Sequence, residues 1–209
     1  MSRFETSKFV RDSSVMRESC LVDACDKLGW TYHKEGDALL ITDIKARCSF
    51  GYEYAIKVEG TKVTYNTYYL GNTKEYVREL QAEYNKLNVE YSRTTVINAF
   101  KKHGFTYQSD EFFQPDEKIK YRFYMVGRSN DREEKDPVGK IKFSIYYDGT
   151  VVSDSNYLPE DVNVRAHASM DDIDADFSSK RVMTKKDVPI EYKDRILQSK
   201  ARYQKSLKK

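Results

Sequence analysis

The chain has 209 residues, enough for one large domain or two small ones, and 33% of its residues are charged. Hydrophobic residues make up only 39%, but 17 Tyr and 10 Phe supply large rings that can fill a core, so the composition excludes a disordered chain. No apolar run approaches the roughly 20 residues of a membrane-spanning helix. The charged first 15 residues predict no signal peptide, and three cysteines without a CxxC pair indicate a reducing, cytoplasmic compartment.

The positive charge of the chain is concentrated at its C-terminus. Residues 180–209 contain 11 basic and 3 acidic side chains, a net charge of +8. Because the whole chain carries +3, residues 1–179 carry −5. A general attraction to phosphate groups is therefore expected from the tail and not from the body of the protein.

The first part of the chain predicts a strand over residues 4–10, a helix, and then an antiparallel meander. The polar residues 12–14 are expected to cap the helix. Its buried stripe has the spacing i, i+3, i+4 and i+7, and Gly29 is a natural stop because glycine adopts the left-handed conformation freely. The stripe consists of Leu21, Ala24, Cys25 and Leu28. The strands that follow are expected at 30–32, 38–41, 52–58 and 64–70.

A second helical segment begins near residue 72, where Asn72 and Glu75 have the spacing of a capping box. Apolar residues then recur every three or four positions up to His103, and Gly104 ends the helix. The polar stretch 88–92 predicts a break in this helix, with one long helix as the alternative.

The next segments alternate between polar and apolar residues, as strands with one buried face do. Residues 118–125 and 141–147 form two such strands, and Asp148-Gly149 is a hairpin signal before residues 150–152. The core-facing residues of the first strand are expected to be Ile119, Tyr121, Phe123 and Met125. Residues 160–180 are acidic and predict an irregular segment, followed by a basic amphipathic helix after Pro189.

A short pattern occurs twice, 75 residues apart, at residues 24–32 and 99–107. Six of the nine positions are identical or exchange one aromatic residue for another. We interpret this as a duplicated helix–Gly–strand unit in an α+β protein whose helices lie on one face of a shared antiparallel sheet. The alternative is a common helix-to-strand junction that arose twice independently. The predicted divisions of the chain are 1–126, with two pseudo-equivalent halves, a hairpin extension at 127–158, the acidic segment 159–188 and the basic helix 189–209.

The opening Met1-Ser2-Arg3-Phe4, the helix stop Lys27-Leu28-Gly29-Trp30, and Gly104-Phe105 followed by Lys118-Ile119-Lys120 resemble an uncharacterised family found in cyanobacteria, plastids and large bacteriophages. The resemblance covers roughly residues 1–126. This family has no established activity, so the resemblance implies no catalytic residue. It implies a small soluble cytoplasmic protein, which acts in the host cytoplasm if a bacteriophage encodes it.

Motifs for metal, nucleotide or nucleophilic chemistry are not found in the sequence. His33, His103 and His167 show no metal-ligand spacing, and no phosphate-binding glycine loop or GxSxG is present. The acidic run 171–176 fails as a calcium loop, because Phe177 stands where glycine is needed and Met183 where a bidentate glutamate is needed. We therefore expect no metal, no cofactor and no catalytic residue that the sequence can identify.

Two basic surfaces are candidate contact sites. If the strands at 118–125 and 141–147 pair, five cations share one sheet face, with Tyr124 nearby as a ring for base stacking. They are Lys118, Lys120, Arg122, Lys140 and Lys142. The second surface is the C-terminal helix with Lys200 and Arg202, which can bind RNA, DNA or an acidic protein.

These observations predict a non-enzymatic accessory protein that binds a protein or nucleic-acid partner through its basic surfaces. Two other classes stay open. A structural subunit of a larger assembly would expose a large aromatic patch. An enzyme would need a deep pocket with convergent residues. The candidates for such a pocket are Asp37, Asp43, Glu53, His33 and His103.

Overall fold

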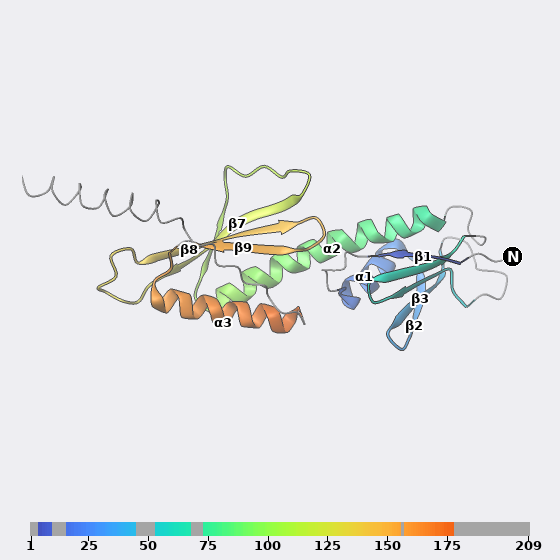
Figure 1. Cartoon of the computed structure of the whole chain (residues 1–209), viewed down its shortest axis with the longest axis horizontal. Helices are drawn as coiled ribbons and strands as arrows, with labels where there is room; N and C mark the ends of the chain where they lie inside the picture. Colours follow the sequence, from blue (N-terminus) through green and yellow to red (C-terminus); the bar gives the residue numbers. More distant parts are fainter. Residues whose placement is uncertain (1–3, 10–15, 45–52, 68–72, 156, 178–209) are drawn as a thin grey trace, which may run out of the picture. The chain divides into compact units, whose positions relative to one another are not determined.

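The computed structural model describes residues 4–9, 16–44, 53–67, 73–155 and 157–177 (Figure 1). Within these ranges the chain forms three helices and two antiparallel sheets, which confirms the predicted α+β class. The helices are α1 (Glu18–Leu28), α2 (Thr73–Lys102) and α3 (Glu160–Asp176). The predicted basic helix 189–209 lies outside the described residues.

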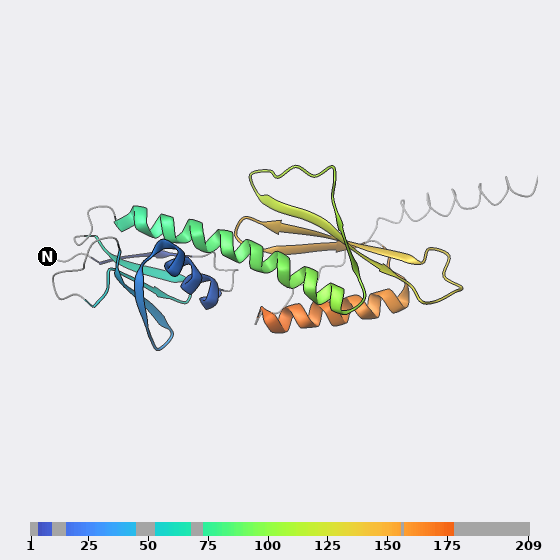
Figure 2. The same ribbon diagram turned by 180° about the vertical axis from the view of Figure 1, so that it is seen from behind.

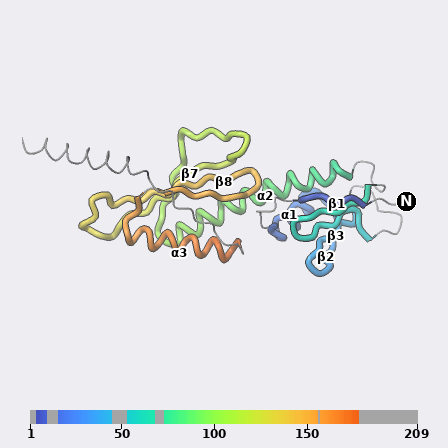
Figure 3. Tube along the Cα trace, in the orientation of Figure 1, coloured from blue at the N-terminus to red at the C-terminus, as the bar shows by residue number. Residues whose placement is uncertain are grey.

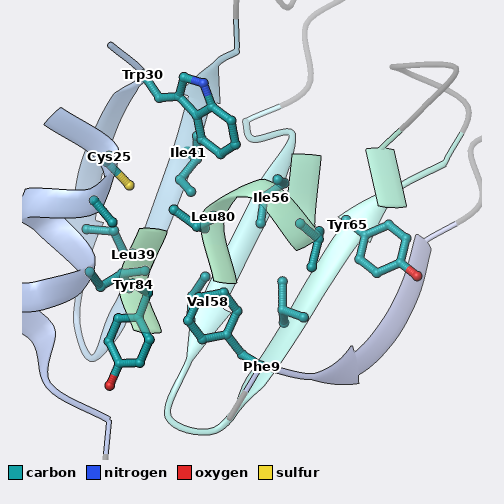
Figure 4. Close-up of a cluster of buried hydrophobic side chains, with 14 of the residues drawn as sticks. Phe9, Cys25, Trp30, Leu39, Ile41, Ile56, Val58, Tyr65, Leu80 and Tyr84 are labelled. Atoms are coloured by element: carbon teal, nitrogen blue, oxygen red, sulfur yellow. The ribbon is translucent and has the colours of Figure 1, made fainter. Parts of the chain in front are cut away.

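The first sheet has the strand order β1-β5-β4-β3-β2, and every neighbouring pair is antiparallel. Its inner face carries Leu39, Ile41, Ile56 and Val58, which pack against α1 and the N-terminal half of α2 (Figure 4). The strands are β1 (Phe4–Lys8), β2 (Thr31–Glu35), β3 (Ala38–Asp43), β4 (Ile56–Glu59) and β5 (Lys62–Asn66).

The second sheet is a four-stranded antiparallel meander with the order β6-β7-β8-β9. Figures 1 and 2 show α2 and α3 on one side of it, and the ring of Phe100 in α2 lies 5.1 Å from that of Phe143 in β8. We call this helix-covered side the inner face and the opposite side the outer face. The strands are β6 (Thr106–Ser109), β7 (Ile119–Arg128), β8 (Val138–Tyr146) and β9 (Val151–Ser155).

The structure repeats one unit, a helix followed by a four-stranded meander and a closing helix. The first unit is α1, β2 to β5 and α2, and the second is α2, β6 to β9 and α3 (Figure 3). Helix α2 therefore belongs to both units. The two units have separate sheets, so the expectation of one shared sheet is wrong. The reason is that each meander pairs with itself, through strands that are neighbours in sequence.

The two helix stops are the same motif in atomic detail. Gly29 and Gly104 have φ angles of 70° and 81°, and each donates its N–H to the carbonyl three residues before it at 3.0 Å. The aromatic residue after each glycine donates to the carbonyl five residues before it, also at 3.0 Å. This pair of bonds defines a Schellman cap. Trp30 and Phe105 are then buried, which explains why the sequence pattern ends on a large ring at this position.

Helix α2 runs without a break for 30 residues, so the break predicted at 88–92 is wrong and the alternative of one long helix is correct. Asn88 and Ser92 are buried and hydrogen-bonded to groups outside the helix. Their polar side chains therefore satisfy tertiary contacts and do not interrupt the helix.

Residues 160–176 form α3, so the prediction of an irregular acidic segment is also wrong. Its buried residues Val162, Ala166, Ser169 and Ile173 follow a helical spacing, but two of them are small and one is polar. The acidic side chains lie away from this stripe, and Asp172 contacts Lys102 at 2.8 Å.

Two smaller expectations concern the ends of elements. Helix α1 begins after Arg17, which makes no side-chain cap, and the predicted capping residues 12–14 lie outside the described residues. Strand β7 continues to Arg128 and pairs with β8, so the division predicted between residues 126 and 127 falls inside a strand.

Candidate functional site

The outer face of the second sheet is built by alternate residues of its four strands. Directly opposite residues in an antiparallel pair point to the same side of the sheet, so the register defines the face. Three cross-strand rows result. They are Thr106, Val126 and Lys140, then Gln108, Tyr124, Lys142 and Asp154, then Arg122, Ser144 and Val152.

Three of the five predicted cations share this face. Arg122, Lys140 and Lys142 lie in its three rows. Lys118 precedes β7, and Lys120 lies at a bulge where the β7–β8 register shifts. The ammonium of Lys120 lies 5.6 Å from the ring centroid of Tyr147, at the end of β8. The expectation that all five cations share one face is therefore wrong, because the bulge breaks the alternation.

The face gains one cation that the sequence analysis missed. Arg128 continues the alternation of β7 beyond Arg122, Tyr124 and Val126, and its side chain is exposed. The alternate positions 122, 124, 126 and 128 could have shown in the sequence that Arg128 shares this face. Arg128 was not predicted, because the strand was expected to end at Met125.

Arg122 is held by an aromatic residue from the β6–β7 loop. Its guanidinium lies 4.5 Å from the ring centroid of Phe113, within the range of a cation–π contact. The loop is fixed at its end by Asp116, whose carboxylate accepts the backbone N–H groups of Lys118 and Ile119, each at 2.7 Å. These two bonds hold the pKa of Asp116 below its ordinary value.

The same loop exposes Phe112, whose side chain is 96% accessible. No other exposed large hydrophobic side chain in the described ranges approaches this fraction. Adjacent phenylalanines in a polar loop were visible in the sequence as Phe112-Phe113, but they have no alternation or helical spacing, so pattern analysis gave them no role. The contact of Phe113 with Arg122 depends on the fold of the loop.

The remaining cations of the face differ in their partners. Lys142 forms an ion pair with Asp154, the single acidic residue in the three rows, at 3.1 Å. Lys140 is exposed. Lys140 is therefore the cation most available to an external phosphate group. Lys142 must break its ion pair with Asp154 before it can bind a phosphate.

A surface pocket of about 630 Å³ adjoins the outer face. The face residues Thr106, Gln108 and Val126 form part of its wall. The other lining residues are Gly104, Tyr107, Arg128, Asn130 and Arg165. The pocket therefore lies where β6 and β7 meet the end of α2.

The residues proposed for a convergent enzyme are not brought together. His33 lies on β2 of the first sheet, in register with Leu40. His103 follows α2, where its Nε2 lies 2.9 Å from Asp172 of α3. Among the residues that the structure describes, no group of three His, Cys, Asp or Glu side chains could hold a metal ion. Lys200 and Arg202 of the predicted tail site lie outside the described residues.

No family model matches the chain, and comparisons with curated proteins and with solved structures find no match either. The resemblance to the uncharacterised family thus stays a prediction. In the described part of the chain, none of the helices combines the length and apolarity needed to cross a membrane.

Proposed function

We propose that this protein is a non-catalytic accessory protein that binds single-stranded nucleic acid on the outer face of its second sheet. The observation that carries the proposal is the register, which puts Arg122, Lys140 and Lys142 on the same face of the sheet as Tyr124. Single-strand binding surfaces commonly have basic side chains along the path of the nucleic-acid backbone and aromatic rings on which the bases stack.

The outer face differs in charge from the rest of the body. Residues 1–179 carry a net charge of −5, so most of the surface of the body repels phosphate groups. The outer face reverses this sign, because its three rows contain three cations and one carboxylate, and Arg128 adds a fourth cation. A strand of phosphates would therefore be attracted to this face in preference to the rest of the body.

Aromatic rings near the cations favour a nucleic acid over other anions, because bases can stack on them. Tyr124 occupies the middle row between Gln108 and Lys142. Phe112 is exposed and precedes Phe113, whose ring lies over Arg122. A single exposed phenylalanine is common at protein surfaces, but one in a loop next to a cationic sheet face offers a ring on which a base can stack. Each base that stacks on such a ring contributes about 1–3 kcal/mol.

The test measures binding of a labelled single-stranded oligonucleotide to the full chain by fluorescence anisotropy. Phe112→Ala should weaken binding about 5- to 150-fold, the equivalent of one lost stacking contact. Lys140→Ala should weaken binding and make the dependence of log K on log salt less steep by about 0.7. The matched controls are Tyr157→Ala, which removes another exposed ring, and Lys101→Ala, which removes an exposed cation of α2.

The basic tail is the competing site for nucleic acid. The double variant Lys200→Glu, Arg202→Glu changes only the tail. If it abolishes binding while the Phe112 and Lys140 variants bind normally, the outer face is not the site. If no oligonucleotide binds the parent chain, binding of a protein partner becomes the function to test. The cytoplasmic location and the bacteriophage-type origin stay predictions.

A further inference from the structure

The pocket beside the outer face is continuous with the proposed binding surface. Thr106, Gln108 and Val126 belong to both. A strand that follows the rows from Arg122 toward Arg128 therefore reaches the pocket at the end of β7. Its volume of about 630 Å³ falls within the range of small-molecule sites, which is about 300–1,000 Å³.

One wall of the pocket is fixed by Arg165 of α3. Its guanidinium donates to the carbonyl of His103 at 3.2 Å and to the carbonyl of Arg128 at 2.5 Å. It also lies 3.5 Å from Asp161. The carbonyls belong to the end of α2 and the end of β7, so Arg165 joins the elements that frame the pocket.

The segment after β7 is held in the same way. Asp161 accepts a hydrogen bond from the Ser129 hydroxyl at 2.6 Å and from the backbone N–H of Asn130 at 3.0 Å. The backbone at Asn130 is thereby fixed, while its amide side chain makes no hydrogen bond to another described residue. Gln108 and Arg128 have side chains in the same condition. Three exposed polar side chains thus line the pocket and make no hydrogen bond to another described residue, so a ligand can bind them in place of water.

The chemistry of the lining selects an anionic ligand with a flat polar group. Asp161 already pairs with Arg165, so Arg128 is the cation of the lining that is available to a ligand, and no carboxylate is among the lining residues. The amides of Gln108 and Asn130 each donate and accept hydrogen bonds, as the edge of a nucleobase does. Val126, on the outer face, supplies apolar surface for the face of a base.

We propose that this pocket binds one nucleotide of the bound strand, with its phosphate on Arg128 and its base edge on Gln108 and Asn130. The inference rests on the proposed function and adds the place where a single base is inserted and read. Sequence-specific recognition of single strands uses unstacked bases in this manner. The remaining bases would stack on the outer face without being read.

The experiment titrates the full chain with AMP, GMP, CMP and UMP separately, and with inorganic phosphate. Binding is followed by the amide shifts of Gln108, Asn130 and Arg128 in nitrogen-15 NMR spectra. At least one nucleotide should bind at least tenfold more tightly than phosphate. Asn130→Asp keeps the size of the side chain and adds a negative charge. It should weaken the binding of that nucleotide at least tenfold. Lys62→Ala, which removes an exposed cation from β5 of the first sheet, should leave the affinity for that nucleotide unchanged.

The outcomes separate this inference from the proposed function. If the oligonucleotide binds the outer face but no mononucleotide shifts the pocket residues, the pocket inference is overturned and the proposed function stands. The same holds if phosphate binds as tightly as every nucleotide, because the base is then not read. If mononucleotides bind in the pocket but no oligonucleotide binds, the proposed function fails, and the inference fails as stated. Far-ultraviolet circular dichroism and the melting temperature check that Asn130→Asp remains folded.

Discussion

Arg17, the residue before α1, donates a hydrogen bond to the side-chain carbonyl of Asn88, which lies 71 positions later in the middle of α2. The amide of Asn88 in turn donates to the carbonyl of Asp148, in the β8–β9 turn, at 2.9 Å. The guanidinium of Arg17 also lies 3.9 Å from the ring centroid of Phe177, just after α3. One buried cluster thus connects the start of the first unit with the turn and the last helix of the second.

The β8–β9 turn is expected to be sensitive to any side chain at Gly149. Its φ is 83°, and an added Cβ would lie 2.3 Å from Nδ2 of Asn88. Gly149→Ala should lower the free energy of unfolding by about 2–5 kcal/mol, since the left-handed conformation costs about 1–2 and the clash about 1–3. Chemical denaturation of the full chain measures this value.

Gly36→Ala is the matched control for that prediction. Gly36 also has a positive φ, 58°, in a hairpin turn, but nothing lies within 4 Å of the added Cβ. Gly36→Ala should lower the free energy of unfolding only by the cost of the left-handed conformation, about 1–2 kcal/mol. Equal losses in the two variants would show that the contact with Asn88 does not constrain the turn.

Gly127 and Gly139 face each other across β7 and β8 and allow α3 to approach the sheet. A Cβ on Gly139 would lie 2.9 Å from Cγ1 of Val162 and 2.7 Å from Cδ2 of Leu158. Gly139→Ala should therefore lower the free energy of unfolding by about 1–3 kcal/mol. In a double variant with Val162→Ala, the loss should be smaller than the sum of the two single losses, because the shorter side chain makes room. Strict additivity in urea denaturation would contradict close packing at this point.

Cys25 is expected to be unreactive in the native protein. It is fully buried, and burial raises the pKa of its thiol to about 12, so almost no thiolate is present at neutral pH. Peptide mapping after treatment with iodoacetamide should find Cys25 unmodified under native conditions and modified in denaturant. A cysteine introduced at the exposed position Thr31 by Thr31→Cys should be modified under both conditions. Rapid native labelling of Cys25 would show that the first core opens readily.

The contribution of Asp161 to stability should decrease in acid. The hydroxyl of Ser129 and the backbone N–H of Asn130 lower the pKa of this carboxyl in the folded state. In the unfolded chain the pKa is about 3.9, so the contribution is complete above roughly pH 5 and is lost as the pH falls through the folded pKa. The difference in unfolding free energy between the parent chain and Asp161→Asn should therefore shrink between pH 6 and pH 3 in urea titrations. A difference that does not change with pH would mean that the carboxylate charge does not contribute.

Asp154 is expected to limit binding on the outer face. Asp154 forms an ion pair with Lys142 and is the one carboxylate in the three rows of the outer face. Asp154→Ala should strengthen oligonucleotide binding by up to about fivefold and steepen the salt dependence by about 0.7, because Lys142 gains a phosphate contact. Asp37→Ala removes the same charge from a turn of the first sheet and should change neither value. Equal effects of the two variants would assign the change to net charge and not to the face.

Local patterns in the sequence were sufficient for the elements with the simplest environments. The glycine stops were predicted because only the residues around Gly29 and Gly104 are needed to form a Schellman cap. The alternation in β7 predicted that Phe123 and Met125 would be buried and Arg122 would lie on the other face. These features depend on neighbours along the chain, which the sequence displays directly.

Other elements were missed because their environment comes from distant residues. Asn88 and Ser92 look like a helix break until Arg17 and the Asp148-Gly149 turn supply their hydrogen-bond partners. Helix α3 was missed because its buried stripe is narrow and contains Ser169, so the surrounding acidic residues determined the prediction.

The sequence alone determined the α+β class, the two helix stops, and the basic character of two strands and the tail, because each of these follows from local composition and spacing. Only the tertiary structure decided that each meander forms its own sheet and that α2 serves both units. It also decided that Lys120 leaves the row of Arg122, that Arg128 and Phe112 join the candidate surface, and that a pocket lies at the edge of that surface. The physical reason is that strand register, bulges and loop folding are set by contacts between residues far apart in the chain.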